Sequence, residues 1–263
     1  TPKVDPELVD EAKQDLYRAL NIKPDLADAL TTLGSIQMLQ DWDWKAAEES
    51  LKAATVAEPN LSIAHLRYGS LLARLGRLPE ALVESERAVD LDPLSLVVQF
   101  FMARILGVAG REDDAIEKVR NMIEMDPGLP GAHMVYGGLL MTKGKYDEAI
   151  AEYNMSLDLG GFTVAVLSYL GAGYGVMGKQ IEAHAVLDQL VKRRKEQYVM
   201  ASAIARVYAG LGENDKAFEW FEKALEERNG EMVFLKVETK AGLFGKSVGS
   251  DPRFQDTLRR IGL

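Results

Sequence analysis

Apolar residues recur at helical spacing along most of the chain, in segments that are separated by short polar breaks. In residues 78–91, for example, Leu82, Ala88, Val89 and Leu91 stand at helical intervals among charged residues. A period near 3.6 residues is typical of amphipathic α-helices. The pattern predicts pairs of helices joined by tight turns, and therefore an all-α fold.

The helix pairs belong to an internal repeat. Successive units are 34 residues apart, except the first two, which are 35 apart. Position 8 is Gly or Ala in all six units, position 20 is Ala in all six, and position 32 is Pro in the first three. Small residues let facing helices approach closely, and proline cannot continue a helix. Because one unit cannot bury its own apolar face, the units must stack. The six units begin at Ala27, Ser62, Leu96, Pro130, Val164 and Tyr198.

These residues and spacings resemble the tetratricopeptide repeat (TPR) family over residues 27–231. The resemblance implies a right-handed solenoid of antiparallel helix pairs, in which the first helix of each pair lines a concave groove. In the family, that groove usually holds an extended peptide or a helix of a partner. Repeats that bind chaperone C-termini carry Lys at position 5 and Asn at position 9 of one helix. No unit of this chain carries that pair, so we do not expect a co-chaperone role.

The two ends of the chain depart from complete repeats. Residues 1–26 keep the spacing of a second helix without a first, which favours an incomplete leading repeat of a longer protein over a simple capping helix. Residues 232–263 lose the repeat and predict capping helices on the last unit, with Asp251 and Pro252 opening the final helix. We expect one continuous solenoid domain.

A second resemblance lies mainly at the C-terminal end of the chain. The segments YAGLGENDKA (208–217), WFEKA (220–224) and SDPRFQ (250–255), together with DWDW (41–44), are similar to bacterial multidomain signalling proteins. In those proteins a repeat region follows a winged-helix, serine/threonine kinase or nucleotide cyclase domain. The similarity implies a parent protein of this type, whose output domain is missing here.

Composition narrows the classes of function. The formal net charge of −9 disfavours binding to nucleic acid, because phosphate contacts need a basic surface. The chain has no cysteine, which excludes disulfides, thiolate metal sites and cysteine nucleophiles. No apolar run is long enough for a membrane span, and the first residues are not a signal peptide. We therefore expect a cytoplasmic protein that binds neither nucleic acid nor membrane through this region.

The candidate binding residues are first-helix side chains that should face the groove. They combine arginine with apolar and aromatic residues, and the only acid at groove positions is Asp28. Arginine pairs with carboxylates and aromatic residues anchor interfaces, so we expect a partner peptide with carboxylates and apolar side chains. For Phe100 or Phe101, packing between neighbouring helices is an equal alternative. The groove candidates are Arg67, Arg74, Phe100, Phe101, Arg104, Met134, Tyr169 and Arg206.

The tryptophan and histidine residues give weaker indications of a binding or catalytic site. Trp42 lies in the one-residue insertion of the first unit, where no packing position of the repeat accounts for it, and it is a candidate for surface contact with a partner. His65 and His133 occupy the same packing position two units apart, and His184 lies on a second helix. We therefore expect no metal site and no catalytic histidine.

The segment GAGYGVMGKQ (171–180) contains two patterns that are typical of nucleotide-binding loops. Such a loop needs a strand before it and a helix N-terminus after it, whereas the preceding segment here is helical. Gln180 also replaces the hydroxyl residue of the motif. We expect no nucleotide or other cofactor. The repeat does not require Gly173 and Gly175, which predict a locally soft helix because glycine destabilises helices.

The sequence thus predicts a non-catalytic protein-interaction scaffold that binds a peptide or helix of a partner in its groove. Two alternatives stay open. The region could be the sensory or regulatory part of a kinase, cyclase or transcription regulator, or it could be a self-assembly module that forms a homo-oligomer.

Overall fold

The computed structural model describes residues 5–240 and 245–263. Residues 1–4 of the predicted leading segment and residues 241–244 of the predicted capping region lie outside the described residues. Within the described ranges the chain is built of helices and turns, without a strand. It forms two compact units, which consist mainly of Lys3–Ile105 (the N-terminal unit) and Leu106–Ile261 (the C-terminal unit).

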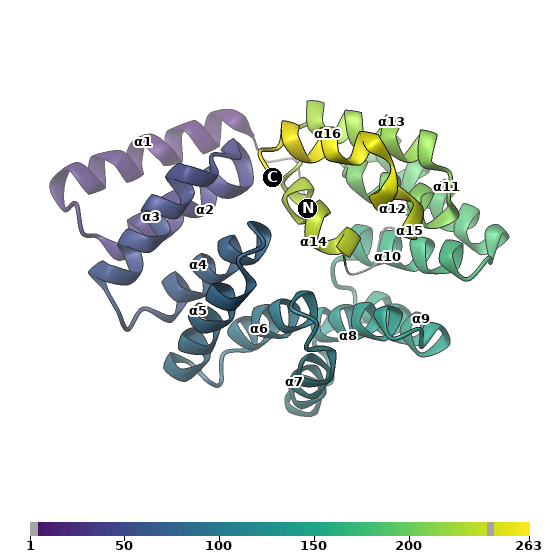
Figure 1. Ribbon diagram of the computed structural model, residues 1–263, viewed down its shortest axis with the longest axis horizontal. Helices are drawn as coiled ribbons and strands as arrows, with labels where there is room; N and C mark the ends of the chain where they lie inside the picture. The colour runs from purple at the N-terminus through teal and green to yellow at the C-terminus, as the bar shows by residue number, and fades with distance from the viewer. Residues whose placement is uncertain (1–4, 241–244) are drawn as a thin grey trace. The chain divides into compact units, whose positions relative to one another are not determined.

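The N-terminal unit contains the leading helix and the first helix pairs (Figure 1). Asp5 caps the first helix by accepting a hydrogen bond from the Glu7 N–H at 3.0 Å, and Pro6 is its first residue. Helix α6 extends beyond the unit boundary. The helices are α1 (Pro6–Ile22), α2 (Ala27–Ile36), α3 (Trp44–Ala57), α4 (Ser62–Arg74), α5 (Leu78–Leu91) and α6 (Leu96–Val108).

The C-terminal unit continues the pairs and ends in a tail of short helices (Figure 1). Its repeat helices are α7 (Glu112–Met125), α8 (Pro130–Thr142), α9 (Tyr146–Asp158), α10 (Thr163–Val176), α11 (Gln180–Glu196), α12 (Ala201–Leu211) and α13 (Asn214–Glu226). The tail consists of a 3-10 turn, η2 (Gly230–Phe234), followed by α14 (Leu235–Lys240), α15 (Gly245–Ser250) and α16 (Pro252–Arg260).

The small residues of the repeat lie where two helices of a pair meet. A Cβ atom on Gly69 would lie 2.6 Å from the Ser85 hydroxyl, and one on Gly137 would lie 2.6 Å from the Tyr153 ring. Position 8 therefore packs against position 24 of the same unit. The alanines at position 20 are completely buried, which agrees with the close approach that the sequence predicts: Ala47, Ala81, Ala115, Ala149, Ala183 and Ala217.

The turn between the two helices of a pair uses a left-handed residue. Gly110, Gly144, Gly178 and Gly212 have φ between 73° and 78° there, a region that favours glycine. In the first unit Trp42 takes this conformation instead, with φ of 56°. The extra residue of that unit is absorbed just before it, in a π-helical turn over Gln37–Asp41.

Two histidines each connect a turn between repeats to the second helix of the following unit. His65 Nδ1 lies 2.7 Å from a Glu84 carboxylate oxygen, and its Nε2 lies 3.0 Å from the Pro59 carbonyl oxygen. His133 repeats the arrangement, with 2.7 Å to Glu152 and 3.1 Å to the Pro127 carbonyl. At the packing position that the sequence predicts for both histidines, each side chain therefore forms two hydrogen bonds. We call this arrangement the histidine clamp.

Replacing His133 with phenylalanine is expected to lower the free energy of unfolding by about 1 to 2 kcal/mol, because two hydrogen bonds are lost at a buried position. Urea unfolding followed by circular dichroism measures the change. His184→Phe is the control, since the His184 side chain is 45% exposed, and should change stability by less. Equal losses in the two variants would show that the clamp does not contribute.

The last helix of the tail lies along α13. Arg260 Nη1 lies 2.6 Å from Glu222 Oε1, and Arg253 Nη1 lies 2.8 Å from Asp215 Oδ1. Phe254 is buried on the same helix. Asp251 caps it and Pro252 is its first residue. α16 thus covers the last repeat helix.

No helix in the described part of the chain is both long and apolar enough to cross a membrane. Nor do residues 5–240 and 245–263 bring three or more His, Asp or Glu side chains together in a way that would hold a metal ion.

Candidate functional site

Four of the predicted groove residues gather on α4 and α6 of the N-terminal unit. The Arg67 guanidinium carbon lies 5.5 Å from the centroid of the Phe101 ring, and that of Arg104 lies 5.8 Å from the centroid of Phe100. The two phenyl rings meet edge to face with centroids 5.4 Å apart. All four side chains are half-buried. We call Arg67, Phe100, Phe101 and Arg104 the α4–α6 cluster.

Arg67 is the most distinctive member of this cluster. Burial lowers its pKa, because removal from water disfavours the charged form. Among the described residues it has no carboxylate partner. Its guanidinium lies over the π face of Phe101, which attracts a cation only modestly. The cluster therefore presents a partly dehydrated positive charge beside aromatic surface. A carboxylate that approaches the cluster would pair with this charge.

Arg74 does not extend this cluster as an open surface. Its side chain is buried, with 5% exposed, and Nη1 donates a hydrogen bond to the Ser70 carbonyl oxygen at 2.6 Å. The sequence places Arg74 at a groove position because of its register. In the structure the guanidinium folds back onto its own helix, so it is not presented to a partner.

Two predicted residues of the C-terminal unit, Tyr169 and Arg206, meet around a carboxylate of the same chain. Arg206 on α12 donates from Nη2 to Glu238 Oε2 at 2.6 Å, and Tyr169 on α10 donates its hydroxyl to Glu238 Oε1 at 2.6 Å. Arg206 also donates from Nη1 to Ser168 Oγ at 2.6 Å and stacks over the Tyr169 ring, 4.3 Å from its centroid. We call Ser168, Tyr169 and Arg206 the carboxylate site.

The carboxylate site is shielded from water. The side chains of Arg206 and Glu238 are 2% and 5% exposed. Burial alone would lower the pKa of Arg206, but the attraction of Glu238, Tyr169 and Glu231 outweighs it and raises that pKa. A buried guanidinium needs such a partner, because an unpaired charge in the interior is costly. The sequence predicts a partner carboxylate at these groove positions, whereas in the structure Arg206 and Tyr169 contact Glu238 of the same chain. Binding of a partner carboxylate by these residues stays a prediction.

The two remaining candidates have mainly structural contacts. Met134 is half-buried and packs against the apolar core of the C-terminal unit. Trp42 is also half-buried, and it holds the left-handed turn of the first unit. A contact of either side chain with a partner stays a prediction.

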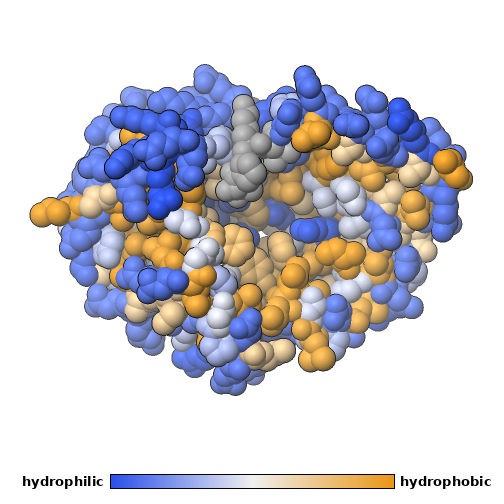
Figure 2. All heavy atoms as spheres, turned by 180° about the vertical axis from the view of Figure 1, so that it is seen from behind, coloured by the Kyte–Doolittle hydropathy of each residue, from blue (hydrophilic) through white to orange (hydrophobic). Residues whose placement is uncertain are grey.

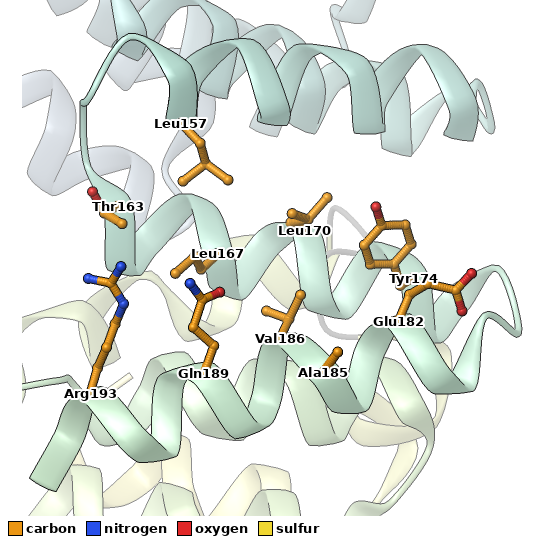
Figure 3. Close-up of a pocket in the computed structure, with 10 residues that line it drawn as sticks. All are labelled: Leu157, Thr163, Leu167, Leu170, Tyr174, Glu182, Ala185, Val186, Gln189 and Arg193. Atoms are coloured by element: carbon orange, nitrogen blue, oxygen red, sulfur yellow. The ribbon is translucent and has the colours of Figure 1, made fainter.

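A further concave feature lies on the other face of α10. It is a cleft of about 510 Å³ between α9, α10 and α11, with leucines on its floor and Arg193 and Glu182 toward its two ends (Figure 3). On α10 its residues follow helical spacing and face away from Tyr169. We call this feature the outer cleft. It is lined by Leu157, Thr163, Leu167, Leu170, Tyr174, Glu182, Ala185, Val186, Gln189 and Arg193.

Our sequence reasoning missed the outer cleft because it considered only groove positions. The signal was present as the stripe Thr163, Leu167, Leu170 and Tyr174 at intervals of four, three and four residues. Exposed apolar side chains adjoin it in sequence, since Phe162 and Ile181 are largely exposed. Figure 2 shows that hydrophobic residues, in orange, are exposed among hydrophilic ones, in blue, on the face that it displays.

The glycine-rich segment lies in α10 and its following turn, and its geometry is that of the repeat. A Cβ atom on Gly175 would lie 2.5 Å from the backbone carbon of Gly210, and one on Gly210 would lie 2.5 Å from the Ala172 Cα atom. α10 and α12 thus cross backbone to backbone. The prediction that Gly175 marks a soft point of the helix is wrong, because this glycine is required by close packing.

Comparisons with known proteins agree with the repeat architecture. The tetratricopeptide repeat family profile matches residues 42–95, 102–162 and 181–231, more than half of the chain. DnaJ homolog subfamily C member 3 of Bos taurus is 30% identical over 93 residues, 35% of this chain and 18% of that protein. The tetratricopeptide repeat and J domain-containing co-chaperone DNJ1 of Fusarium oxysporum is 29% identical over 117 residues, 42% of this chain and 22% of that protein. The chain spans about a fifth of the length of these curated relatives.

Solved structures share the fold at lower identity. PilW, a type IV pilus biogenesis factor, aligns with a TM-score of 0.59 and 16% identity over 89% of this chain and 98% of that chain. PilF of Pseudomonas aeruginosa aligns with a TM-score of 0.55 and 22% identity over 71% of this chain and 84% of that chain. At these identities the likeness concerns the fold alone.

Proposed function

The chain belongs to the tetratricopeptide repeat family, whose repeats indicate a protein-interaction scaffold, and we propose that it binds an acidic peptide segment of a partner through the α4–α6 cluster. The observation that carries this proposal is Arg67, a half-buried arginine over the Phe101 ring that has no carboxylate partner among the described residues. A peptide carboxylate next to an apolar side chain matches both features. The role is non-catalytic binding.

The test uses peptides selected from a random phage-displayed library against the whole chain. Selected peptides should be enriched in Asp or Glu beside an apolar residue. Arg67→Gln is expected to weaken the selected peptide about tenfold or more, because a charge-assisted hydrogen bond contributes about 1.5 to 3 kcal/mol. Fluorescence anisotropy with the labelled peptide measures the affinity.

Arg193→Gln is the matched control for this prediction. It makes the same change on the outer cleft, where Arg193 lies at one end of an apolar floor. The peptide should bind this variant as it binds the unaltered chain. If Arg193→Gln weakens binding and Arg67→Gln does not, the outer cleft is the binding surface and the proposal for the α4–α6 cluster is wrong.

We further propose a wider role for the chain as part of a larger protein. The similarity of the C-terminal segments supports a place in a bacterial signalling or regulatory protein, in the cytoplasm, as the region that receives a partner. The full reading frame tests this idea directly, since a kinase, cyclase or winged-helix domain upstream would support it. Light scattering on the isolated chain tests the remaining alternative, self-assembly.

A further inference from the structure

The carboxylate site is built entirely by two first helices of the repeat, and its occupant comes from the tail. Ser168 and Tyr169 lie on α10 and Arg206 on α12, whereas Glu238 lies on α14. Both oxygens of the Glu238 carboxylate accept a hydrogen bond, at 2.6 Å each. The site therefore recognises a carboxylate in a defined orientation, as a site for a ligand does.

Two residues of α14, Leu235 and Glu238, are buried. Leu235 is 1% exposed and lies three residues before Glu238, so both side chains fall on one face of the helix. On the neighbouring helix α15, a Cβ atom on Gly249 would lie 2.8 Å from the Thr239 side chain. On α14 the buried Leu235 and the buried Glu238 carboxylate are thus spaced by about one helical turn.

We propose that the carboxylate site binds a helical partner segment that carries a glutamate one turn after an apolar residue, and that α14 occupies this site in cis until such a segment displaces it. The proposal extends the proposed function, because it takes the repeat surface as a binding surface. It concerns a different unit from the α4–α6 cluster, so each can fail without the other.

Two properties of α14 make it replaceable. It has only six residues, and a helix that short is unstable by itself in water. Its buried charge pair also carries a desolvation cost that offsets much of the attraction. A partner glutamate would take over the bonds to Arg206 and Tyr169, so the exchange leaves no buried charge unpaired.

The side chains next to the carboxylate site are buried as well. The hydroxyl of Tyr153 is buried without a hydrogen-bond partner among the described residues, and its ring stacks on Tyr169 with centroids 6.1 Å apart. Ser168 is completely buried and Tyr169 is half-buried, so water has limited access to the bonds around Arg206. In such surroundings an arginine distinguishes a carboxylate from a neutral amide strongly.

The experiment displaces α14 from the carboxylate site by charge reversal at Glu238. The α14 sequence is then added as a separate peptide. Glu238→Lys places a cation against Arg206, which should eject α14, and Glu222→Lys makes the same change at an exposed ion pair with Arg260. The probe is a fluorescent peptide of residues 229–240 (NGEMVFLKVETK). It should bind the Glu238→Lys chain at least about tenfold tighter than the unaltered chain or the Glu222→Lys control, because the competing segment is removed.

Two further arms separate binding from misfolding. A peptide with glutamine in place of its glutamate should lose at least about tenfold in affinity for the Glu238→Lys chain. The double variant Arg206→Met, Glu238→Lys should not bind the probe, whereas the peptide selected for the α4–α6 cluster should bind all variants alike. Equal probe binding by the unaltered and Glu238→Lys chains would overturn the proposal. So would a dimer of the unaltered chain that Glu238→Lys dissociates, since α14 would then act between two copies.

Discussion

Replacing Gly175 with alanine is expected to lower the free energy of unfolding by about 2 kcal/mol or more. The added Cβ would lie 2.5 to 2.7 Å from backbone atoms of Gly210 and Leu211, and backbone atoms of a packed helix cannot move aside as a side chain can. Overpacking of this kind typically costs about 1 to 3 kcal/mol or more. The cost exceeds the gain of about 1 kcal/mol that alanine brings to a helix. Urea unfolding followed by circular dichroism measures the difference.

Gly173→Ala is the matched control on the same helix. A Cβ atom there would meet the Met141 methyl carbon at 3.3 Å and the Ile150 Cδ1 atom at 3.4 Å. Both are ends of flexible side chains, so this variant should be as stable as the unaltered chain or more stable by up to about 1 kcal/mol. If both alanine variants are equally stable, α10 and α12 do not cross as closely as the structure indicates.

The repeat register predicted the helix pairs and their packing because each of its positions has the same structural constraint in every unit. Position 20 needs a small side chain wherever two helices of a pair meet, as at Ala47 and Ala217, and the turn needs a left-handed residue, as at Gly144. These needs recur every 34 residues, so a single sequence displays each of them several times. The family profile confirms the repeat that this pattern predicted.

The repeat register could not predict contacts that occur only once in the chain. Gly175 and Gly210 meet between first helices of successive units, a contact that the pattern within one unit does not reveal. Glu238 lies 32 residues from Arg206, in a tail that follows no repeat. The register therefore placed Arg206 and Tyr169 at groove positions, but it could not identify the acid of the same chain that both of them contact.

Replacing Tyr153 with alanine is expected to have the largest effect on stability, a loss of about 3 to 5 kcal/mol. The side chain is 1% exposed, and its ring fills the space beside Gly137, where a Cβ atom would lie 2.6 Å from it. Removing a buried aromatic ring leaves a cavity that the surrounding helices fill only partly. The loss should also loosen Tyr169, which stacks on this ring and holds Glu238.

Tyr153→Phe should behave in the opposite way, because the hydroxyl alone contributes nothing favourable. It is buried without a hydrogen-bond partner among the described residues, and burial raises the pKa of this tyrosine, since the charged form would be still less stable there. Deleting an unsatisfied buried polar group removes its desolvation cost, so the phenylalanine variant should match or exceed the stability of the unaltered chain in urea. A loss near that of Tyr153→Ala would mean that the hydroxyl, rather than the ring, anchors α9 against α10.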